Sequence, residues 1–502
     1  MKVCPVVTLI LALWSHSPTI LAETGKPNII LIVLDTLRAD RLSLSGYPRR
    51  TTPNIEAFAR DSVVYSKAHS VAPWTLPSHM SMFTGWMPSR HGADWNAYGH
   101  PEDMDLEQIV SGSFKLSEPS RLLAVKLKKN GYKSAAFSSN AWVSVRTGME
   151  EGFDEFREMW KVDTSHRKYF EWAPPGLRKR SWFPEGYRGI SEFDFGDAGL
   201  VIREFKDFLS KHDNIQEAPW FLFFNFIDPH YPYSPPASWR YRYSDDVELG
   251  ERIATFEFSE FAMDAGQRPV DVRRFNPFYD GEISYVDDAI GRLLEILIAR
   301  GLYQDTLIIL TSDHGEHLGE KGHFSHQFSV EEELLWVPLV IKFPGNQGSG
   351  TVIDNPLVST LDLYQTALSA AGLESRDGSS DTASKDLSDM QNFHRRYLLA
   401  EYSYSLPYLK ASHKAYSGFD IAANRVTRRV VYDGRERHVF IDSDLPLNPA
   451  TSVVAEHSKA RQAAEDFLQS FLQQLPVENS EHSEEEIDEK NLERLRSLGY
   501  VE

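Results

Sequence analysis

Three runs of consecutive apolar residues interrupt an otherwise mixed sequence. They cover 28–34 (NIILIVL), 220–227 (WFLFFNFI) and 306–311 (TLIILT), and all are rich in β-branched or aromatic residues. A strand with one face in water alternates apolar and polar residues, so unbroken runs of this length predict strands buried on both faces, as in a parallel sheet. Further strands are predicted at 134–137 and 337–342.

Amphipathic segments lie between these strands. Helices are predicted at 122–130, 279–300 and 362–371, and glycines directly after the first two mark their ends. Another helix is predicted to begin at Pro53, with Thr52 as its N-cap. Strands that alternate with helices predict an α/β domain with a mostly parallel central sheet flanked by helices on both faces.

The pattern changes after residue 373. A polar stretch at 374–394 predicts a linker or loop. Beyond it, strands at 397–404, 429–432 and 438–441, a hairpin turn at 433–434 and an amphipathic helix at 459–475 predict a small α+β C-terminal subdomain. The predicted organisation is therefore a large domain at 26–373, a C-terminal subdomain at 395–476 and an acidic, solvated tail at 477–502.

The overall charge excludes some classes of partner. The 502 residues carry a formal net charge of -19, whereas nucleic-acid binding requires a basic face. The same acidity disfavours docking on an anionic membrane surface. No stable membrane span is expected. A small anionic substrate remains compatible, because a metal ion and a few cationic groups can dominate the local field.

Residues 1–22 have the features of a signal peptide. Lys2 precedes an apolar stretch at 3–14, which is too short to span a bilayer, and Ala22 offers a cleavage site. We expect a periplasmic or secreted protein; the alternative is an uncleaved anchor. Cys4 is the only cysteine, so the mature chain would have no disulfide and no thiolate ligand.

Acidic and imidazole side chains follow each of the three apolar runs. Asp35 follows the first, Asp228 and His230 the second, and Asp313 and His314 the third. Ligands of α/β sheets bind beyond the carboxyl ends of the strands. Taken singly, Asp35 could be an N-cap or a structural ion pair, and His230 could be structural. Together, Asp35, Asp313 and His314 predict a site for a divalent cation, and Gly315 would permit the turn that this needs.

Thr75 lies in the segment APWTLPSH, where Pro77 favours the first turn of a helix. Free backbone N–H groups at a helix start favour an anion, and a hydroxyl beside a cation there is an activated nucleophile. The alternative is that Thr75 only caps the helix. In the loop after His314, His323 or His326 could bind a tetrahedral anion or protonate a leaving group. The alternative is a polar surface loop.

From Lys26 to about Leu373 the chain resembles the sulfatase family of the alkaline phosphatase superfamily. The end of the chain, NLERLRSLGYV, also resembles the tail of many bacterial members. The stretches that carry the resemblance are NIILIVLDTLRADRLSLSGY, TTPNIEAFARDSVVYSKAHS, APWTLPSHMSMFTG, NFIDPHYPYSPP, YDGEISYVDDAIGRLL and LTSDHGEHLGEKGHFSHQFSVEEELLWVPLVI.

The resemblance implies the family fold and one divalent metal ion held by Asp35, Asp313 and His314, with the nucleophile Thr75 also bound to it. Calcium is the family's ion, and manganese or zinc also suits this donor set. His230 matches the family histidine that contacts the sulfate or phosphate and assists the leaving group. Three further residues stand at positions that imply substrate binding: His79 where the nucleophile motif has arginine, His326 where the family has lysine, and Asn140 where a lysine and a histidine are usual.

The nucleophile position departs from the usual pattern. Sulfatases convert a cysteine or serine to formylglycine, and Thr75 is neither. Thr36 replaces the second of two paired aspartates, a usual calcium ligand. A threonine nucleophile resembles instead the phosphodiesterases and phosphoglycerol transferases of the superfamily, which pass through a phospho-threonine.

These observations predict a hydrolase that cleaves sulfate or phosphate/phosphonate esters through a covalent Thr75 intermediate. The expected substrate is a small anionic ester or a sulfated or phosphorylated glycan. Two alternatives stay open. One is a transferase that passes the group to a glycan or lipid hydroxyl, and the other is a catalytically silent metal-binding homologue.

Overall fold

The structure, a computed structural model, describes most of the large domain and parts of the C-terminal region. The predicted signal peptide, the turn at 433–434, most of the linker and most of the acidic tail lie outside the described residues. Those described are 25–93, 112–113, 116–159, 197–254, 272–326, 329–354, 357–373, 382–389, 393–405, 425–432, 435–443, 459–475 and 483–484.

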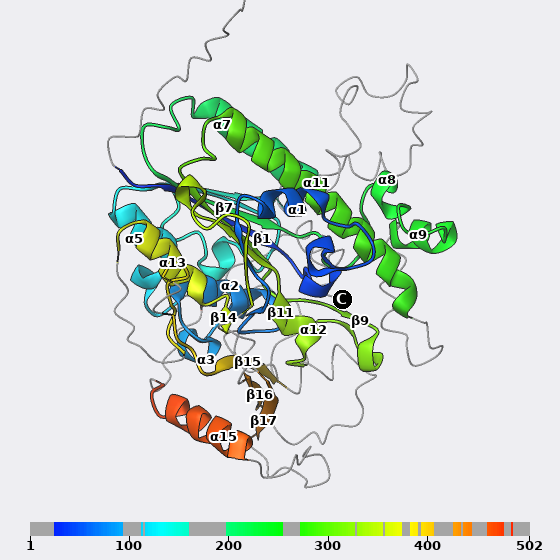
Figure 1. Ribbon diagram of the computed structural model, residues 1–502, viewed down its shortest axis with the longest axis vertical. Helices are drawn as coiled ribbons and strands as arrows, with labels where there is room; N and C mark the ends of the chain where they lie inside the picture. The colour runs from blue at the N-terminus through cyan, green and yellow to red at the C-terminus, as the bar shows by residue number, and fades with distance from the viewer. Residues whose placement is uncertain are drawn as a thin grey trace, which may run out of the picture.

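An eight-stranded sheet forms the centre of the molecule (Figure 1), with the order β13-β2-β12-β8-β1-β7-β5-β6. The three apolar runs form its middle: β1 (Asn28–Leu34) lies between β7 (Trp220–Phe226) and β8 (Thr306–Thr311), parallel to both. The prediction of a mostly parallel sheet is confirmed. The other strands are β2 (Val63–Tyr65), β5 (Lys133–Ser138), β6 (Glu155–Glu158), β12 (Leu339–Lys342) and β13 (Thr351–Ile353).

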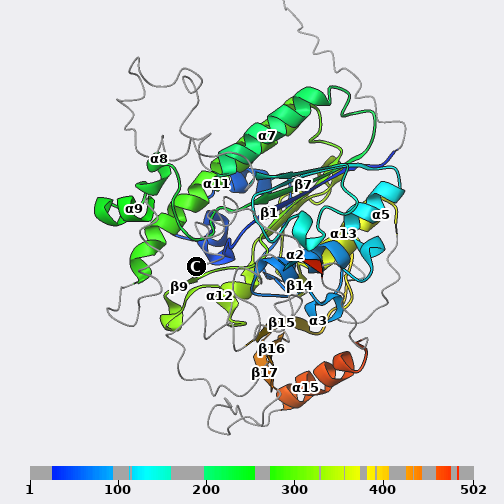
Figure 2. The same ribbon diagram turned by 180° about the vertical axis from the view of Figure 1, so that it is seen from behind.

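Helices cover both faces of this sheet (Figures 1 and 2), as predicted. Alternate residues of β1 show why: Ile29, Leu31 and Val33 belong to one apolar core and Ile30 and Ile32 to the other. A strand that is apolar at every position needs a packed layer on each side. The first core includes α2 (Thr75–Thr84), α5 (Leu123–Lys129) and α13 (Asp362–Ala370), and the second includes α1 (Pro53–Ala59), α7 (Asp197–Lys211) and α11 (Asn276–Ala299).

The strand predicted at 337–342 divides between two sheets. Trp336–Val337 forms β11, which pairs with β3 (Ala68–His69), whereas β12 joins the central sheet antiparallel to β8 and β2. The prediction of a strand is therefore confirmed for 339–342, whereas Val337 belongs to the separate strand β11. Pro338 stands at the division; it has no N–H to donate to a ladder, and its carbonyl accepts a hydrogen bond from the Thr311 hydroxyl instead (2.8 Å).

The N-terminus of α1 is capped from a distant part of the chain. Thr52 makes no side-chain cap, so that prediction was wrong; its hydroxyl accepts a hydrogen bond from the Ser43 N–H (3.1 Å). Asp287 of α11 takes the role, because its carboxylate accepts bonds from the N–H groups of Asn54 (3.0 Å) and Ile55 (2.9 Å). Helix starts leave such amides without partners, and a carboxylate there also meets the positive end of the helix dipole.

Replacing Asp287 with alanine should therefore destabilise the fold by about 1–2 kcal/mol, the usual effect of losing a cap. Asp288→Ala, on the same helix but in an exposed ion pair with Arg292, should have a smaller effect. Urea unfolding of both variants measures the two free energies of unfolding. Equal losses would contradict the assignment of Asp287 as the cap.

The C-terminal region contains a three-stranded antiparallel sheet of β15 (Leu398–Ser405), β16 (Arg425–Tyr432) and β17 (Arg437–Ser443). Helix α15 (Lys459–Leu472) packs on it (Figure 2), and this pairing of a sheet with a helix was predicted. Glu401 of β15 ties the sheet to the large domain, because it accepts bonds from the Ser89 N–H (3.0 Å) and hydroxyl (2.7 Å).

Within the described residues, no helix is long and apolar enough to cross a membrane. The remaining helices and strands are short. The short α-helices of the described residues are α3 (Pro88–His91), α8 (Ala237–Arg240), α9 (Val247–Ala254) and α12 (Glu332–Leu335), and several 3-10 turns lie between the longer elements. The short strands are β4 (Gly112–Ser113), β9 (His317–Leu318), β10 (Phe324–Ser325), β14 (Val358–Ser359) and β18 (Ser483–Glu484).

Candidate active site

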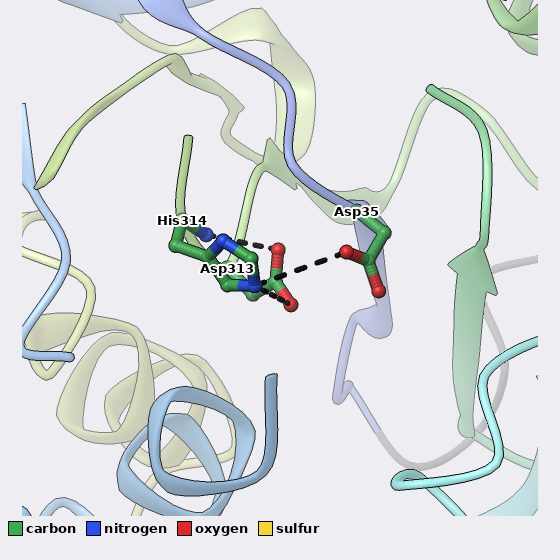
Figure 3. Close-up of side chains that lie close together, drawn as sticks. All are labelled: Asp35, Asp313 and His314. Atoms are coloured by element: carbon green, nitrogen blue, oxygen red, sulfur yellow. Dashed lines mark hydrogen bonds and ion pairs between the residues drawn. The ribbon is translucent and has the colours of Figure 1, made fainter. Parts of the chain in front are cut away.

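The ends of β1 and β8 bring Asp35, Asp313 and His314 together (Figure 3). Each offers a ligand atom, and these atoms all lie within 4.8 Å of one another. The Nε2 atom of His314 is 3.5 Å from Asp313 Oδ2 and 3.9 Å from Asp35 Oδ1. All three side chains are 0% exposed. The grouping expected from the strand ends is therefore present in the fold.

Among the described residues, two carboxylate oxygens in this group have no hydrogen-bond partner. They are Asp35 Oδ1 and Asp313 Oδ2, both buried. Burial, together with the charge of Asp313, raises the pKa of Asp35 well above its usual value, and burial also raises the pKa of Asp313. Buried carboxylates are costly unless a cation or hydrogen bonds compensate them. Two unpartnered oxygens and one imidazole nitrogen fit a divalent cation.

A hydrogen bond of the His314 ring leaves the other ring nitrogen, Nε2, able to bind a metal ion. Its Nδ1–H donates to the Gly315 carbonyl (2.8 Å), which leaves the lone pair on Nε2, the nitrogen nearest the two carboxylates. Burial lowers the pKa of His314 well below its usual value, so the ring is neutral. Gly315 is needed for a close approach rather than for a left-handed turn, because a Cβ there would lie 2.0 Å from the Glu333 carbonyl oxygen.

Thr75 is the first residue of α2, and its hydroxyl faces the same group. Its Oγ1 lies 3.5 Å from His314 Nε2 and 3.4 Å from the Asn140 amide nitrogen. The side chain is 1% exposed, and the N-cap position belongs to Trp74, which makes no side-chain cap. The hydroxyl therefore lies at a helix N-terminus, where backbone amides and the dipole favour a developing negative charge.

Asn140 follows β5 and contacts both sides of the site. Its Nδ2 donates to Asp35 Oδ2 (2.5 Å), which leaves Oδ1 as the unpartnered oxygen of that carboxylate. Its backbone N–H donates to the side-chain oxygen of Asn225 (3.0 Å). Asn225 was missed by the sequence analysis, although the signal exists: it is the one polar residue inside the apolar run at 220–227.

Two further imidazoles lie beside His314. The ring of His326 is 4.5 Å from that of His314 and 5.0 Å from that of His230. Burial lowers the pKa of both His230 and His326 to about 3, so both are neutral. His323 is elsewhere, with its ring 5.1 Å from that of His317. The structure thus brings His230 and His326 to the site.

Glu316 is a second residue that the sequence analysis missed. It is fully buried, and its Oε1 lies 3.1 Å from His326 Nδ1. Burial raises its pKa to about 7, against the opposing effect of His230 and His314. The available signal was its position two residues after His314, in a segment already identified as a strand end.

His79 lies behind Thr75, one helical turn along α2. It is 0% exposed, and its Nδ1 lies 2.9 Å from the Thr75 carbonyl oxygen and 3.5 Å from Asp313 Oδ2. Its Nε2 faces the Asn225 side chain at 3.3 Å. Both ring nitrogens of this predicted substrate-binding residue therefore contact protein groups.

Thr36 adopts an unusual backbone conformation directly after Asp35. Its φ is 58°, in the left-handed region that β-branched residues rarely occupy. Its N–H donates to Asp313 Oδ1 (3.2 Å), and its buried Oγ1 has no hydrogen-bond partner in the described part of the chain. Position 36 therefore lies beside the cation-binding group, where the family pattern has an aspartate.

The chain matches the sulfatase family over residues 27–373. An arylsulfatase of Clostridium perfringens is 25% identical to it over 408 residues, which cover 76% of this chain and 82% of that protein. In structure it is similar to a phosphonate monoester hydrolase of Silicibacter pomeroyi, with a TM-score of 0.61 and 21% identity over 89% of this chain and 95% of that one.

A further solved protein of similar fold is in complex with its substrate, D-glucosamine-2-N,6-O-disulfate. It has a TM-score of 0.58 and 16% identity over 89% of this chain and 98% of that one. The family match covers more than half of the chain, and the buried Asp35, Asp313 and His314 form a group of the kind that would hold the metal ion of a sulfatase. The chain belongs to the sulfatase family and is a hydrolase of that family.

Proposed function

We propose that this protein hydrolyses sulfate or phosphate/phosphonate esters through a covalent ester on Thr75. One observation carries the proposal. The Thr75 hydroxyl lies at a helix start, 3.5 Å from the nitrogen of His314 that faces two unpartnered carboxylate oxygens. One buried site therefore contains the proposed nucleophile, a helix start that can stabilise an anion, and the group proposed to bind the cation.

Asp35, Asp313 and His314 would hold one divalent ion, with Thr75 beside it. Calcium is the choice by family, and manganese or zinc also suits two carboxylates and an imidazole. When bound, such an ion supplies positive charge that stabilises an anionic hydroxyl and the oxygens of the ester. The donor set suits such an ion, because His314 is neutral and one oxygen of each carboxylate makes no hydrogen bond within the described part of the chain.

The chemistry conserves atoms and protons over two steps. Thr75 Oγ1 attacks the sulfur or phosphorus in line with the leaving oxygen; the new O–S or O–P bond forms as the ester bond breaks. Thr75 gives its proton to solvent, and His230, protonated when the anionic ester binds, gives one to the leaving oxygen. Water then attacks the sulfur or phosphorus as the bond to Thr75 Oγ1 breaks. One proton of that water returns to His230, Oγ1 takes a proton from solvent, and sulfate, phosphate or phosphonate leaves.

His230 and His326 are proposed to stabilise the negative charge of the ester. Both are neutral in the site as it stands, with pKa values of about 3. An anion placed beside them favours their charged forms and raises those pKa values. Substrate binding would thus give His230 the proton that it donates. Asn140, with its amide 3.4 Å from the Thr75 hydroxyl, is proposed to bind an oxygen of the ester.

The natural substrate is proposed to be a small anionic ester or a sulfated or phosphorylated glycan outside the cytoplasm. The signal-like segment at 1–22 supports a periplasmic or secreted location. The sulfated sugar bound by the structural relative described above supports a glycan.

A panel of substrates and metals tests the proposal. Purified protein stripped of metal should gain turnover of at least one ester class among aryl sulfates, phosphate monoesters, phosphodiesters and phosphonate monoesters when Ca²⁺, Mn²⁺ or Zn²⁺ is restored. Turnover that requires an added glycan or lipid alcohol would indicate a transferase instead. No turnover under any combination would indicate a silent homologue.

Introducing the family's second aspartate gives a further prediction. Thr36→Asp should bind Ca²⁺ about tenfold or more tightly, because each added carboxylate raises calcium affinity. Aspartate also tolerates the left-handed backbone at this position better than threonine does. Calorimetric titration of the variant with CaCl₂ measures the affinity. Thr36→Asn, which has the same shape without the charge, is the control, and equal affinities of the two variants would contradict the prediction.

A further inference from the structure

His79 is placed where the nucleophile motif of the family has a permanently charged arginine. Here the side chain is a histidine that is completely buried, with its ring edge-on to Phe223 (6.1 Å between ring centres). Its Nδ1 lies 3.5 Å from Asp313 Oδ2, so the ring stands beside one of the proposed ligands of the cation.

The neighbouring asparagine determines which nitrogen of His79 carries the proton. The Asn140 N–H donates to the side-chain oxygen of Asn225 (3.0 Å), which fixes the orientation of that amide. The NH₂ group of Asn225 therefore faces His79 Nε2 (3.3 Å), and this nitrogen must accept. The proton of a neutral ring then lies on Nδ1, where it can reach the Thr75 carbonyl (2.9 Å).

This network joins the parts of the chain that carry the site. Asn225 is on β7, Asn140 follows β5, Thr75 begins α2, and Asp313 follows β8. All of these side chains are at most 1% exposed, so water does not compete for the bonds. The His79 ring contacts the Thr75 carbonyl at the helix start, Asn225 on β7 and Asp313 at the end of β8.

We propose that His79 is a positioning residue, held by Asn225 in the Nδ1–H form, that fixes Thr75 and Asp313 relative to each other. The expected loss of kcat rests on the proposed function of Thr75 as the nucleophile. The positioning role itself does not depend on that function. It assigns His79 no contact with substrate. The hydrogen-bond pattern and the effect on cation binding are independent of turnover.

Two substitutions separate the two nitrogens of His79. In His79→Asn the amide nitrogen can take the place of Nδ1 and donate to the Thr75 carbonyl. In His79→Gln the amide reaches toward Asn225 and the Nδ1 donor is lost. We expect kcat of His79→Gln to fall about 100-fold, the effect of misplacing a reacting group by about 1 Å, while KM changes little. His79→Asn should recover a large part of that loss.

His91 provides the matched control. It is also buried (4% exposed), and its ring nitrogens bond the Ser81 hydroxyl (2.9 Å) and the Ala93 N–H (3.0 Å) and lie beside the Pro77 carbonyl, so these bonds involve neither Thr75 nor Asp313. His91→Gln should lose stability without losing kcat. An equal fall of kcat in His91→Gln and His79→Gln would overturn the proposal, because it would reduce the effect to general loosening of the core.

Two measurements test the role of His79 without measuring enzyme activity. Nitrogen-15 NMR of the histidine rings in the wild-type chain should show His79 protonated at Nδ1; protonation at Nε2 would overturn the proposal. Titration with Mn²⁺ alone should show affinity falling about 10-fold or more in His79→Gln, as for other groups that orient a ligand. Unchanged affinity would overturn it. If the wild-type chain hydrolyses nothing, the proposed function fails and these two results still test His79.

Discussion

Replacing Thr75 with alanine is expected to reduce kcat about 1,000-fold or more, because the proposed mechanism has no second nucleophile. Thr75→Ser keeps the hydroxyl and should keep most of the turnover. The fold should be nearly unaffected. Within the residues that the structure describes, the hydroxyl makes two long contacts, at 3.5 Å to His314 and 3.4 Å to Asn140, so its loss breaks no strong hydrogen bond there.

Steady-state kinetics of Thr75→Ala and of Thr84→Ala make the comparison. Thr84 is a buried threonine at the other end of α2, and its hydroxyl donates to the Met80 carbonyl (2.7 Å). Its alanine variant should retain kcat. Wild-type protein quenched during turnover should carry the sulfuryl or phosphoryl group on the Thr75 peptide in mass spectrometry. Undiminished turnover in Thr75→Ala would refute the proposed intermediate.

The largest loss of stability is expected from Arg395→Met. Arg395 makes a two-pronged ion pair with Asp362 (2.6 and 2.7 Å), and both side chains are buried. The carboxylate of Asp362 also accepts bonds from the N–H groups of Ser359 and Lys385 (both 2.9 Å). Removing the guanidinium leaves a buried charge without its counter-ion, which costs about 3–5 kcal/mol.

Urea unfolding measures this loss, and an exposed ion pair provides the control. Arg292 and Asp288 on α11 are 3.1 Å apart and about 40% exposed (41% and 37%). Arg292→Met should cost about 1 kcal/mol or less, since exposed pairs contribute little. The double variant Arg395→Met/Asp362→Asn should recover part of the loss by removing the stranded charge. A loss for Arg395→Met no larger than that for Arg292→Met would contradict the expectation.

The central sheet could be predicted because its signal is local. The strands at 28–34 and 306–311 are apolar at nearly every position, and burial on both faces leaves a parallel sheet as the natural arrangement. The N-cap of α1 could not be found in the same way. Asp287 lies 233 residues from Asn54, and nothing near Thr52 in the sequence shows that a distant carboxylate occupies the amides.

The residues of the candidate site that follow strand ends could be predicted from the sequence. The residues that join the site through contacts with distant parts of the chain could not. The parallel register brings Asp35 beside Asp313 and His314 without further information. Asn225 and Glu316 act through bonds to His79 and His326, and such pairings depend on the packed fold. Gly315 shows the same limit: the sequence suggested a turn, whereas the fold requires room for the Glu333 carbonyl.

One cation is expected to bind among Asp35, Asp313, His314 and Thr75. Crystals grown with MnCl₂ and measured at the manganese absorption edge would locate it. One strong anomalous peak is expected within bonding distance of both carboxylates and of His314 Nε2, next to the Thr75 hydroxyl. A fully occupied manganese ion elsewhere with this place vacant, or no bound manganese at all, would contradict it.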